Sequence, residues 1–201
     1  QYTGKDIWIV KTDGSGNLEW MNNYYSSDIV DEEGFDIIQH SDGSFFVAGR
    51  RFYQGVGNYA AILKTSSNGT QLWMRTMRLE QHQYSYGDYK FSSIIEIDDG
   101  LALTGSTGSV ANNDGGGIIF FIINESGDVL TETNIGNEYD VGNTILDNSD
   151  GSFVIGGAKW DADEQYLDAW LFNVRGKDAE YSPLPNFYTL IDKSKKICFF
   201  C

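Results

Sequence analysis

The 201-residue chain has few cysteines, prolines and basic residues. Its two cysteines, Cys198 and Cys201, are too few for a disulfide framework, so the fold must depend on its core. Two prolines beside 23 glycines fit many tight turns and argue against a proline-rich linker. With 14 basic against 29 acidic side chains, the formal charge of −15 would repel phosphate backbones and anionic membrane surfaces. We therefore expect no nucleic-acid partner.

Long hydrophobic runs, helical periodicity and a leader-like start are also lacking. The longest apolar run, residues 118–123, has the length of a strand and falls well short of the roughly 18 residues of a membrane span. We therefore expect no membrane insertion. No window of about a dozen residues places apolar side chains at helical spacing behind a capping box. The chain begins at Gln1 without a signal-type segment, which predicts a mature form or an excised piece.

The chain does contain an internal repeat with a period of roughly 50 residues. One phrase, Lys-Thr followed by a Gly turn and Trp, occupies residues 11–20 and 64–73 and returns more faintly at 123–130. A second phrase, Asp-Gly followed by an apolar stretch and Gly, occupies residues 41–49, 98–105 and 149–156. Each unit reads as four short strands in two hairpins. A repeated unit of this kind buries its apolar face by stacking on its neighbours.

These units predict an all-β fold, namely a single-domain β-propeller of four-stranded antiparallel blades over residues 1–201. The complete blades are expected at 28–79, 80–135 and 136–182. Residues 1–27 supply only a second hairpin, and residues 183–201 align with a first hairpin, with Phe187 matching Phe35 and Ile197 matching Phe45. We expect these two half blades to pair, which closes a ring of four and removes the exposed sheet edges. The alternative is a fragment of a longer propeller.

The phrases at 11–20 and 42–49 resemble the repeats of secreted or cell-surface bacterial and archaeal β-propeller proteins. That group is similar in outline to quinoprotein-like propellers, whose blades also end in a turn followed by Trp. The resemblance covers nearly the whole chain, and it implies a propeller that is usually exported or displayed at a cell surface. The third unit departs from the pattern, because the region of Thr131 stands where Trp20 and Trp73 stand in the other units.

Most recurring residues are expected to have structural roles. A large ring at a fixed position, as at Trp20 and Trp73, is expected to wedge between successive sheets, and Trp8 and Trp170 recur in a similar way. Turn chemistry explains the recurring Asp and Gly residues, which are Gly16, Gly69, Gly127, Asp42, Gly43, Gly100 and Gly151. It also explains the sequons at Asn68 and Asn124, which fall on turns that favour Asn and Gly.

Metal and cofactor chemistry is only weakly suggested by the sequence. Asp161, Asp163 and Asp168 lie in a stretch between hairpins where oxygen ligands could gather around calcium, although their spacing is not that of a dedicated calcium loop. A solvated acidic loop is the preferred interpretation. Cys198 and Cys201 form a Cys-Phe-Phe-Cys pair that lacks the further ligands of a zinc site. We expect no resident cofactor.

Catalytic motifs are missing, which favours a non-enzymatic function. His40, Ser41 and Asp42 are consecutive, and side chains on a hairpin are expected to point in alternating directions instead of forming a relay. We expect an exported module that serves as a structural or recognition scaffold through its loops, with a protein or glycan partner at a cell surface. One alternative is a quinoprotein-like or glycan-active enzyme or cofactor binder with a site at the central opening. Another is a filament or array subunit that self-associates through its terminal half blades.

Overall fold

The computed structural model describes residues 4–25, 30–79, 88–108, 116–137, 139–161, 166–175 and 181–183. These residues form fourteen strands in four antiparallel sheets and contain no helix. The expected all-β fold is therefore confirmed. None of the described segments is a helix with the length and apolar character needed to cross a membrane.

Each sheet is a run of strands that are consecutive in the sequence. Sheet I contains β1 (Ile7–Thr12) and β2 (Leu18–Tyr24). Sheet II contains β3 (Val30–Gln39), β4 (Phe45–Tyr53), β5 (Gly57–Thr65) and β6 (Gln71–Met77). Sheet III contains β7 (Tyr89–Ile97), β8 (Gly100–Thr107), β9 (Gly117–Ile123) and β10 (Val129–Ile135). Sheet IV contains β11 (Val141–Asp147), β12 (Ser152–Asp161), β13 (Tyr166–Arg175) and β14 (Tyr181–Pro183).

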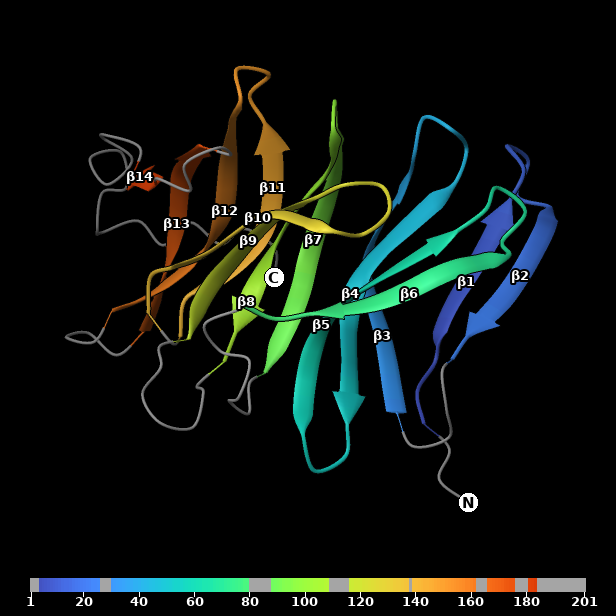
Figure 1. The fold of residues 1–201 in the computed structure, drawn as a ribbon, viewed down its shortest axis with the longest axis horizontal. Coiled ribbons are helices and arrows are strands. Elements are labelled where there is room, and N and C mark those ends of the chain that lie inside the picture. Colours follow the sequence, from blue (N-terminus) through green and yellow to red (C-terminus); the bar gives the residue numbers. More distant parts are fainter. Residues whose placement is uncertain are drawn as a thin grey trace.

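The sheets follow one another in chain order across the molecule (Figure 1). The first strands of sheets II, III and IV are neighbours, because β7 lies beside both β3 and β11. The described strands do not close into a ring, so the structure establishes four antiparallel sheets and no finer architecture. Residues 184–201 lie outside the described residues, and their pairing with the N-terminal half blade therefore stays a prediction.

Apolar cores fill the spaces between successive sheets. Ile7 and Ile9 of sheet I pack with Val47 and Leu63 of sheet II. Sheets II and III share a core in which Phe91 meets Phe121 edge-on, with ring centroids 5.3 Å apart. A third core joins sheets III and IV around Phe120 and Phe172. Strands such as β5 and β9 are apolar on both faces because a sheet covers each side of them.

In sheets II, III and IV, a glycine in the second strand lets the backbone of that strand lie very close to the bulged first strand. A Cβ added at Gly49, Gly105 or Gly157 would lie 1.9 Å from a backbone oxygen of the first strand of its own sheet. Each of these glycines faces a residue of the third strand, namely Ala61, Ile119 and Trp170. This common register identifies residues that occupy the same place in different sheets. By the same comparison, Thr131 faces Ile122 as Trp73 faces Lys64.

The turns of the second repeat phrase have two different geometries, although they share the Asp-Gly pair. At residues 40–44, His40 N–H bonds to Ser44 O, Gly43 N–H bonds to His40 O, and Gly43 alone has a positive φ. At residues 97–100, Ile97 faces Gly100 directly, which leaves a loop of only two residues. The turn at residues 40–44 is a five-residue turn in which only Gly43 adopts the left-handed backbone region.

Candidate functional site

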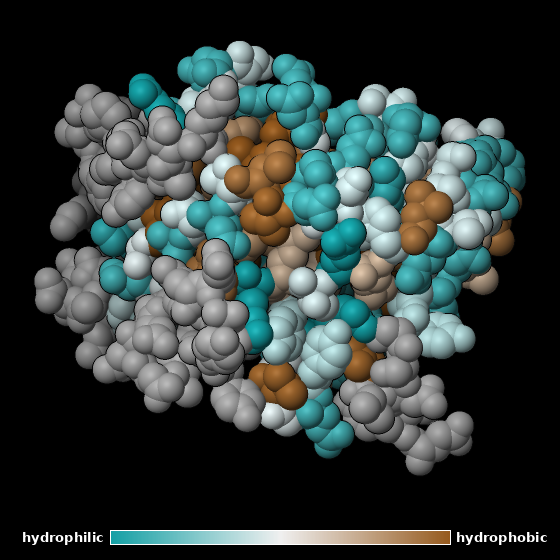
Figure 2. All heavy atoms as spheres, viewed as in Figure 1, coloured by the Kyte–Doolittle hydropathy of each residue, from teal (hydrophilic) through white to brown (hydrophobic). Residues whose placement is uncertain are grey.

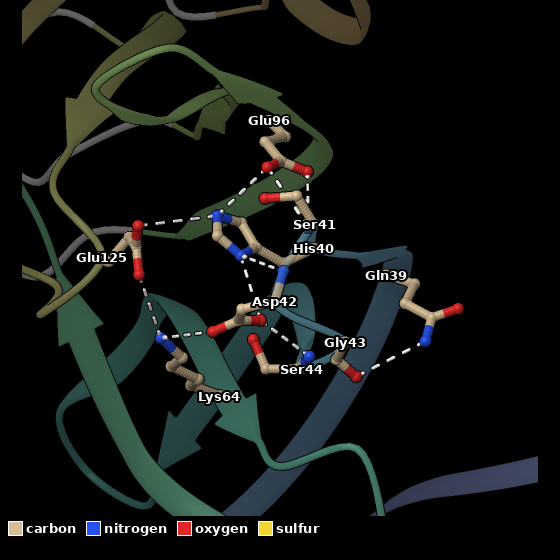
Figure 3. A network of polar contacts seen from close by, with 9 residues as sticks. All are labelled: Gln39, His40, Ser41, Asp42, Gly43, Ser44, Lys64, Glu96 and Glu125. Atoms are coloured by element: carbon tan, nitrogen blue, oxygen red, sulfur yellow. Dashed lines mark hydrogen bonds and ion pairs between the residues drawn. The ribbon is translucent and has the colours of Figure 1, made fainter.

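A cluster of charged side chains joins sheets II and III at the end where the short turns lie. We call it the His40 cluster; it contains His40, Asp42, Lys64, Glu96 and Glu125 (Figure 3). His40 and Asp42 come from the turn between β3 and β4, and Lys64 comes from the end of β5. Glu96 lies in β7, and Glu125 lies in the turn between β9 and β10. The cluster therefore depends on the stacking of two sheets.

His40 is the central and most buried titratable group of this cluster, with 7% of its surface exposed. Its Nδ1 lies 3.0 Å from Asp42 Oδ1, and its Nε2 lies 3.3 Å from Glu96 Oε1 and 3.8 Å from Glu125 Oε1. The backbone N–H of Asp42 also approaches Nδ1, at 3.3 Å. When Nδ1 accepts that N–H, the imidazole proton resides on Nε2 and faces Glu96. A protonated ring would instead have a carboxylate at each nitrogen.

His40 and Asp42 lie in the turn at residues 40–44, and their side chains meet there. Ser41 donates from its backbone N–H to Glu96, at 3.1 and 3.2 Å from the two carboxylate oxygens. The turn of sheet II is therefore held against β7 of sheet III by both its backbone and its histidine.

Asp42 is stabilised as a carboxylate by its own turn. Ser44 lies against it and donates a backbone N–H to Oδ1 at 2.8 Å, and Ser44 together with His40 lowers the pKa of Asp42 to about 2. A carboxyl group whose pKa is depressed in the folded state stabilises the fold above its ordinary pKa. This stabilisation is lost as the pH falls from about 4 toward 2. With the Asp42 side chain 48% exposed, solvent screening limits the effect to about 1 kcal/mol.

Lys64 supplies the cation of the cluster. Its Nζ lies 3.6 Å from Glu125 Oε2 and 4.0 Å from Asp42 Oδ2, and 4.8 Å from the centre of the Phe46 ring. His40, Asp42 and Glu125 each offer a metal-ligand atom within 4.8 Å of the others. Lys64 approaches both of these carboxylates, so an ion would have to compete with its ammonium group. The arrangement therefore acts first as a polar contact between two sheets, in which three carboxylates surround His40 and Lys64.

The calcium suggestion at Asp161, Asp163 and Asp168 stays a prediction. Asp161 is the last residue of β12 and pairs with Tyr166, and Asp168 lies two residues further along β13, where it pairs with Lys159. Asp163 lies outside the described residues. Among the described residues, the group with metal-ligand proximity is formed by His40, Asp42 and Glu125. The one signal for that cluster in the sequence is that charged residues fall in the turns of two successive repeats.

The recurring tryptophans and turn glycines contact each other across sheets. A Cβ added at Gly69 would lie 2.8 Å from Cε3 of Trp20, and one added at Gly127 would lie 3.2 Å from Cη2 of Trp73. Five of the recurring turn glycines have a φ between 81° and 85°, namely Gly16, Gly43, Gly69, Gly127 and Gly151. The φ of Gly100 is 141°. Each of these Trp residues thus lies against a turn of the next sheet.

The sequon asparagines organise their turns with side chains and not with positive φ. Oδ1 of Asn68 accepts hydrogen bonds from the backbone N–H of Thr70 at 3.2 Å and from its hydroxyl at 2.9 Å. Oδ1 of Asn124 accepts the backbone N–H of Asp128 at 2.9 Å. Neither Asn is among the residues with positive φ. Asn68 and Asn124 therefore stabilise their turns through side-chain hydrogen bonds.

A groove of about 830 Å³ separates β1 from β3. Its floor includes Ile7, Ile9 and Val47, and its walls carry Trp8, Val10, Phe35 and Ile37, which are 61%, 44%, 47% and 45% exposed. At one end, Glu33 bonds to both Lys5 Nζ and Arg50 Nε at 2.6 Å. The hydrogen bond from Lys5 is the main cause of a lowered pKa at Glu33. This groove was not foreseen from the sequence.

No protein-family model matches the chain, and no curated protein matches it at a significant level. The functional conclusion therefore rests on the geometry described above.

Proposed function

We propose that the chain is an exported β-propeller-type module that acts as a non-enzymatic recognition or structural scaffold at a cell surface. In this architecture, the half blades at 1–27 and 183–201 complete a ring of four. The observation that carries the proposal is the contrast between the two ends of the stacked sheets. One end has connections of two to five residues, and the other end also carries two longer connections, 78–88 and 108–116.

The short-turn end is rigidly hydrogen-bonded. The turns at 13–17, 40–44, 66–70, 124–128 and 148–152 each close with a backbone bond between their first and last residues. Asp13 and Asp42 add bonds from side chain to backbone within their turns. The His40 cluster then ties two of these turns to the neighbouring sheet. Such a framework holds the opposite strand ends in fixed positions.

The opposite end is where the chain varies between repeats. The connections between strands there are 25–29, 54–56, 78–88, 108–116, 136–140 and 162–165, so they range from three to eleven residues and differ in composition. They include the Tyr-rich stretch with Tyr84 and Tyr86 and the acidic stretch with Asp161 and Asp163. Variable loops on a rigid scaffold are a common basis of recognition, and tyrosines are frequent in contact surfaces. Figure 2 shows hydrophilic and hydrophobic residues interspersed on the face it displays.

The experiment is a binding and turnover test on the same samples. The full chain is applied to an array of bacterial and host glycans and to immobilised surface-protein ectodomains, while product release from the glycans is measured. We expect binding without turnover, and loss of that binding in the double variant Tyr84→Ala, Tyr86→Ala. Ser67→Ala, at the exposed tip of a short turn, is the matched control and should bind normally. Turnover of a glycan, or binding that only the control variant weakens, would contradict the proposal.

A further inference from the structure

Among the described strands, β1 has no partner on the side where the corresponding strand of sheet II has one. The repeat places β1 in register with β5, because Lys11 faces Trp20 as Lys64 faces Trp73. β5 lies between β4 and β6, whereas β1 pairs with β2 alone among the described strands. In the part of the chain that the structure describes, sheet I therefore has no strand equivalent to β4, and this side of β1 could accept a further strand.

The groove beside this edge has the character of an unfilled core. Trp8 and Val10 correspond to Ala61 and Leu63, which are 2% and 0% exposed because sheets lie on both sides of β5. Ile7 and Ile9 on the opposite face of β1 are already buried against sheet II. A strand that is apolar on both faces is typical of the interior of a stack. An added strand at this edge would continue the floor formed by Ile7, Ile9 and Val47.

We propose that this groove is a strand-acceptor site and that its occupant is the segment 197–200 of the same chain. This inference rests on the proposed propeller and names the strand that completes it. The segment Ile-Cys-Phe-Phe is apolar at every position, as an interior strand requires. Thirteen residues, 184–196, join Pro183 at the end of β14 to this segment, which leaves room for the strand and turn that precede it in the repeat.

The repeat also fixes a register. In sheet II, Phe46 faces Lys64 and Val47 faces Leu63. Because Ile197 matches Phe45, Cys198 is expected to face Lys11, Phe199 to face Val10 and Phe200 to face Ile9. Cys201 would then occupy the place of Gly49, where an added Cβ lies 1.9 Å from Glu33 O in sheet II. The pairing should therefore end at Phe200.

Disulfide trapping tests this register with a native cysteine. The variant Lys11→Cys, in a Cys201→Ser background, should form an intramolecular bond with Cys198 on mild oxidation, because directly opposed residues approach within disulfide range. The control Val10→Cys points to the other face of the strand and should react about tenfold more slowly or less. Non-reducing electrophoresis and peptide mass mapping identify the product. Near-ultraviolet circular dichroism of the reduced variants checks that both are folded.

Each outcome decides a separate point. Rapid trapping at position 11 in a monomer supports the proposal. Equal rates at positions 10 and 11, or no bond at either in folded protein, would overturn the register. A bond found only in dimers, at a rate that rises with protein concentration, would assign the groove to a second copy and overturn the intramolecular occupant. None of these results depends on glycan or protein binding, so a failure here is distinguishable from a failure of the scaffold function.

Discussion

The hairpins β1–β2 and β5–β6 carry the same sequence phrase in different surroundings. In both, a Lys-Thr pair ends the first strand, a Gly with positive φ makes the turn, and Trp follows in the second strand. Ala61 and Leu63 are 2% and 0% exposed, whereas Trp8 and Val10 at the same places are 61% and 44% exposed. The phrase thus determines the hairpin, and the neighbouring sheets determine its burial.

The charged residues of these hairpins differ in the same way. Lys11 pairs with Glu19 on its own hairpin, and its side chain is 29% exposed. Lys64 is 11% exposed and approaches carboxylates from two other turns, one of them on sheet III. The lysine of this repeat position therefore makes a local ion pair in sheet I, at the end of the stack. In sheet II, which has a sheet on each side, it takes part in a contact between sheets.

The largest expected difference comes from truncating the buried apolar residue. Leu63→Ala should lower the free energy of unfolding by about 2–5 kcal/mol, because it leaves a cavity between sheets I and II. Val10→Ala should cost about 1 kcal/mol if segment 197–200 covers it, against a few tenths for a solvent-exposed position. Urea denaturation of both variants provides the values. Equal losses at the two positions would mean that β1 and β5 are equally covered in solution.

A smaller difference is expected at the turn glycines. Gly16→Ala should cost about 1 kcal/mol from left-handed backbone strain alone, because no atom lies within 4 Å of the added Cβ. Gly69→Ala has the same strain and also pushes against Trp20 and Asn22, so it should cost about 2–3 kcal/mol.

Thermal unfolding followed by circular dichroism separates the two glycine variants. The Gly69 turn is also held by Tyr24, whose hydroxyl donates to Gly69 O at 2.7 Å. The extra loss of stability should largely disappear in a Trp20→Ala, Asn22→Ala background, since both side chains that the added Cβ would meet are then truncated. A similar loss with and without these two side chains would show that this contact between sheets is energetically unimportant.

Much of the fold was readable from the sequence because it is local and repeated. The strand pairs follow from the spacing of turn residues and apolar stretches. The four-stranded meanders of sheets II and III therefore match the predicted order of two hairpins per repeat. The turns at 40–44 and 97–100 share the Asp-Gly pair, yet five residues lie between the paired Gln39 and Phe45 and only two between the paired Ile97 and Gly100. Turn type depends on strand register, which two residues do not encode.

The candidate site was much less predictable. His40, Glu96 and Glu125 are far apart in the sequence, and they meet only because one sheet stacks on the next with a particular offset. Proximity along the chain could not predict this cluster, because the stacking of sheets, and not the hairpin, brings its charged groups together.

The smallest expected difference concerns the two lysines. Lys64→Met keeps the apolar stem over Phe46 but removes the positive charge, leaving Asp42, Glu96 and Glu125 around His40 without a compensating cation. We expect Lys64→Met to lower the free energy of unfolding by about 1 kcal/mol in low salt. Lys11→Met should lower it by no more than about 0.5 kcal/mol, because the ion pair of Lys11 with Glu19 is local. Chemical denaturation at low and high ionic strength should show the Lys64 loss shrinking as salt screens the carboxylates from one another. An equal and salt-independent effect of both substitutions would mean that the charge at position 64 contributes nothing to the contact between sheets II and III, and that its packing against Phe46 is the reason it is buried.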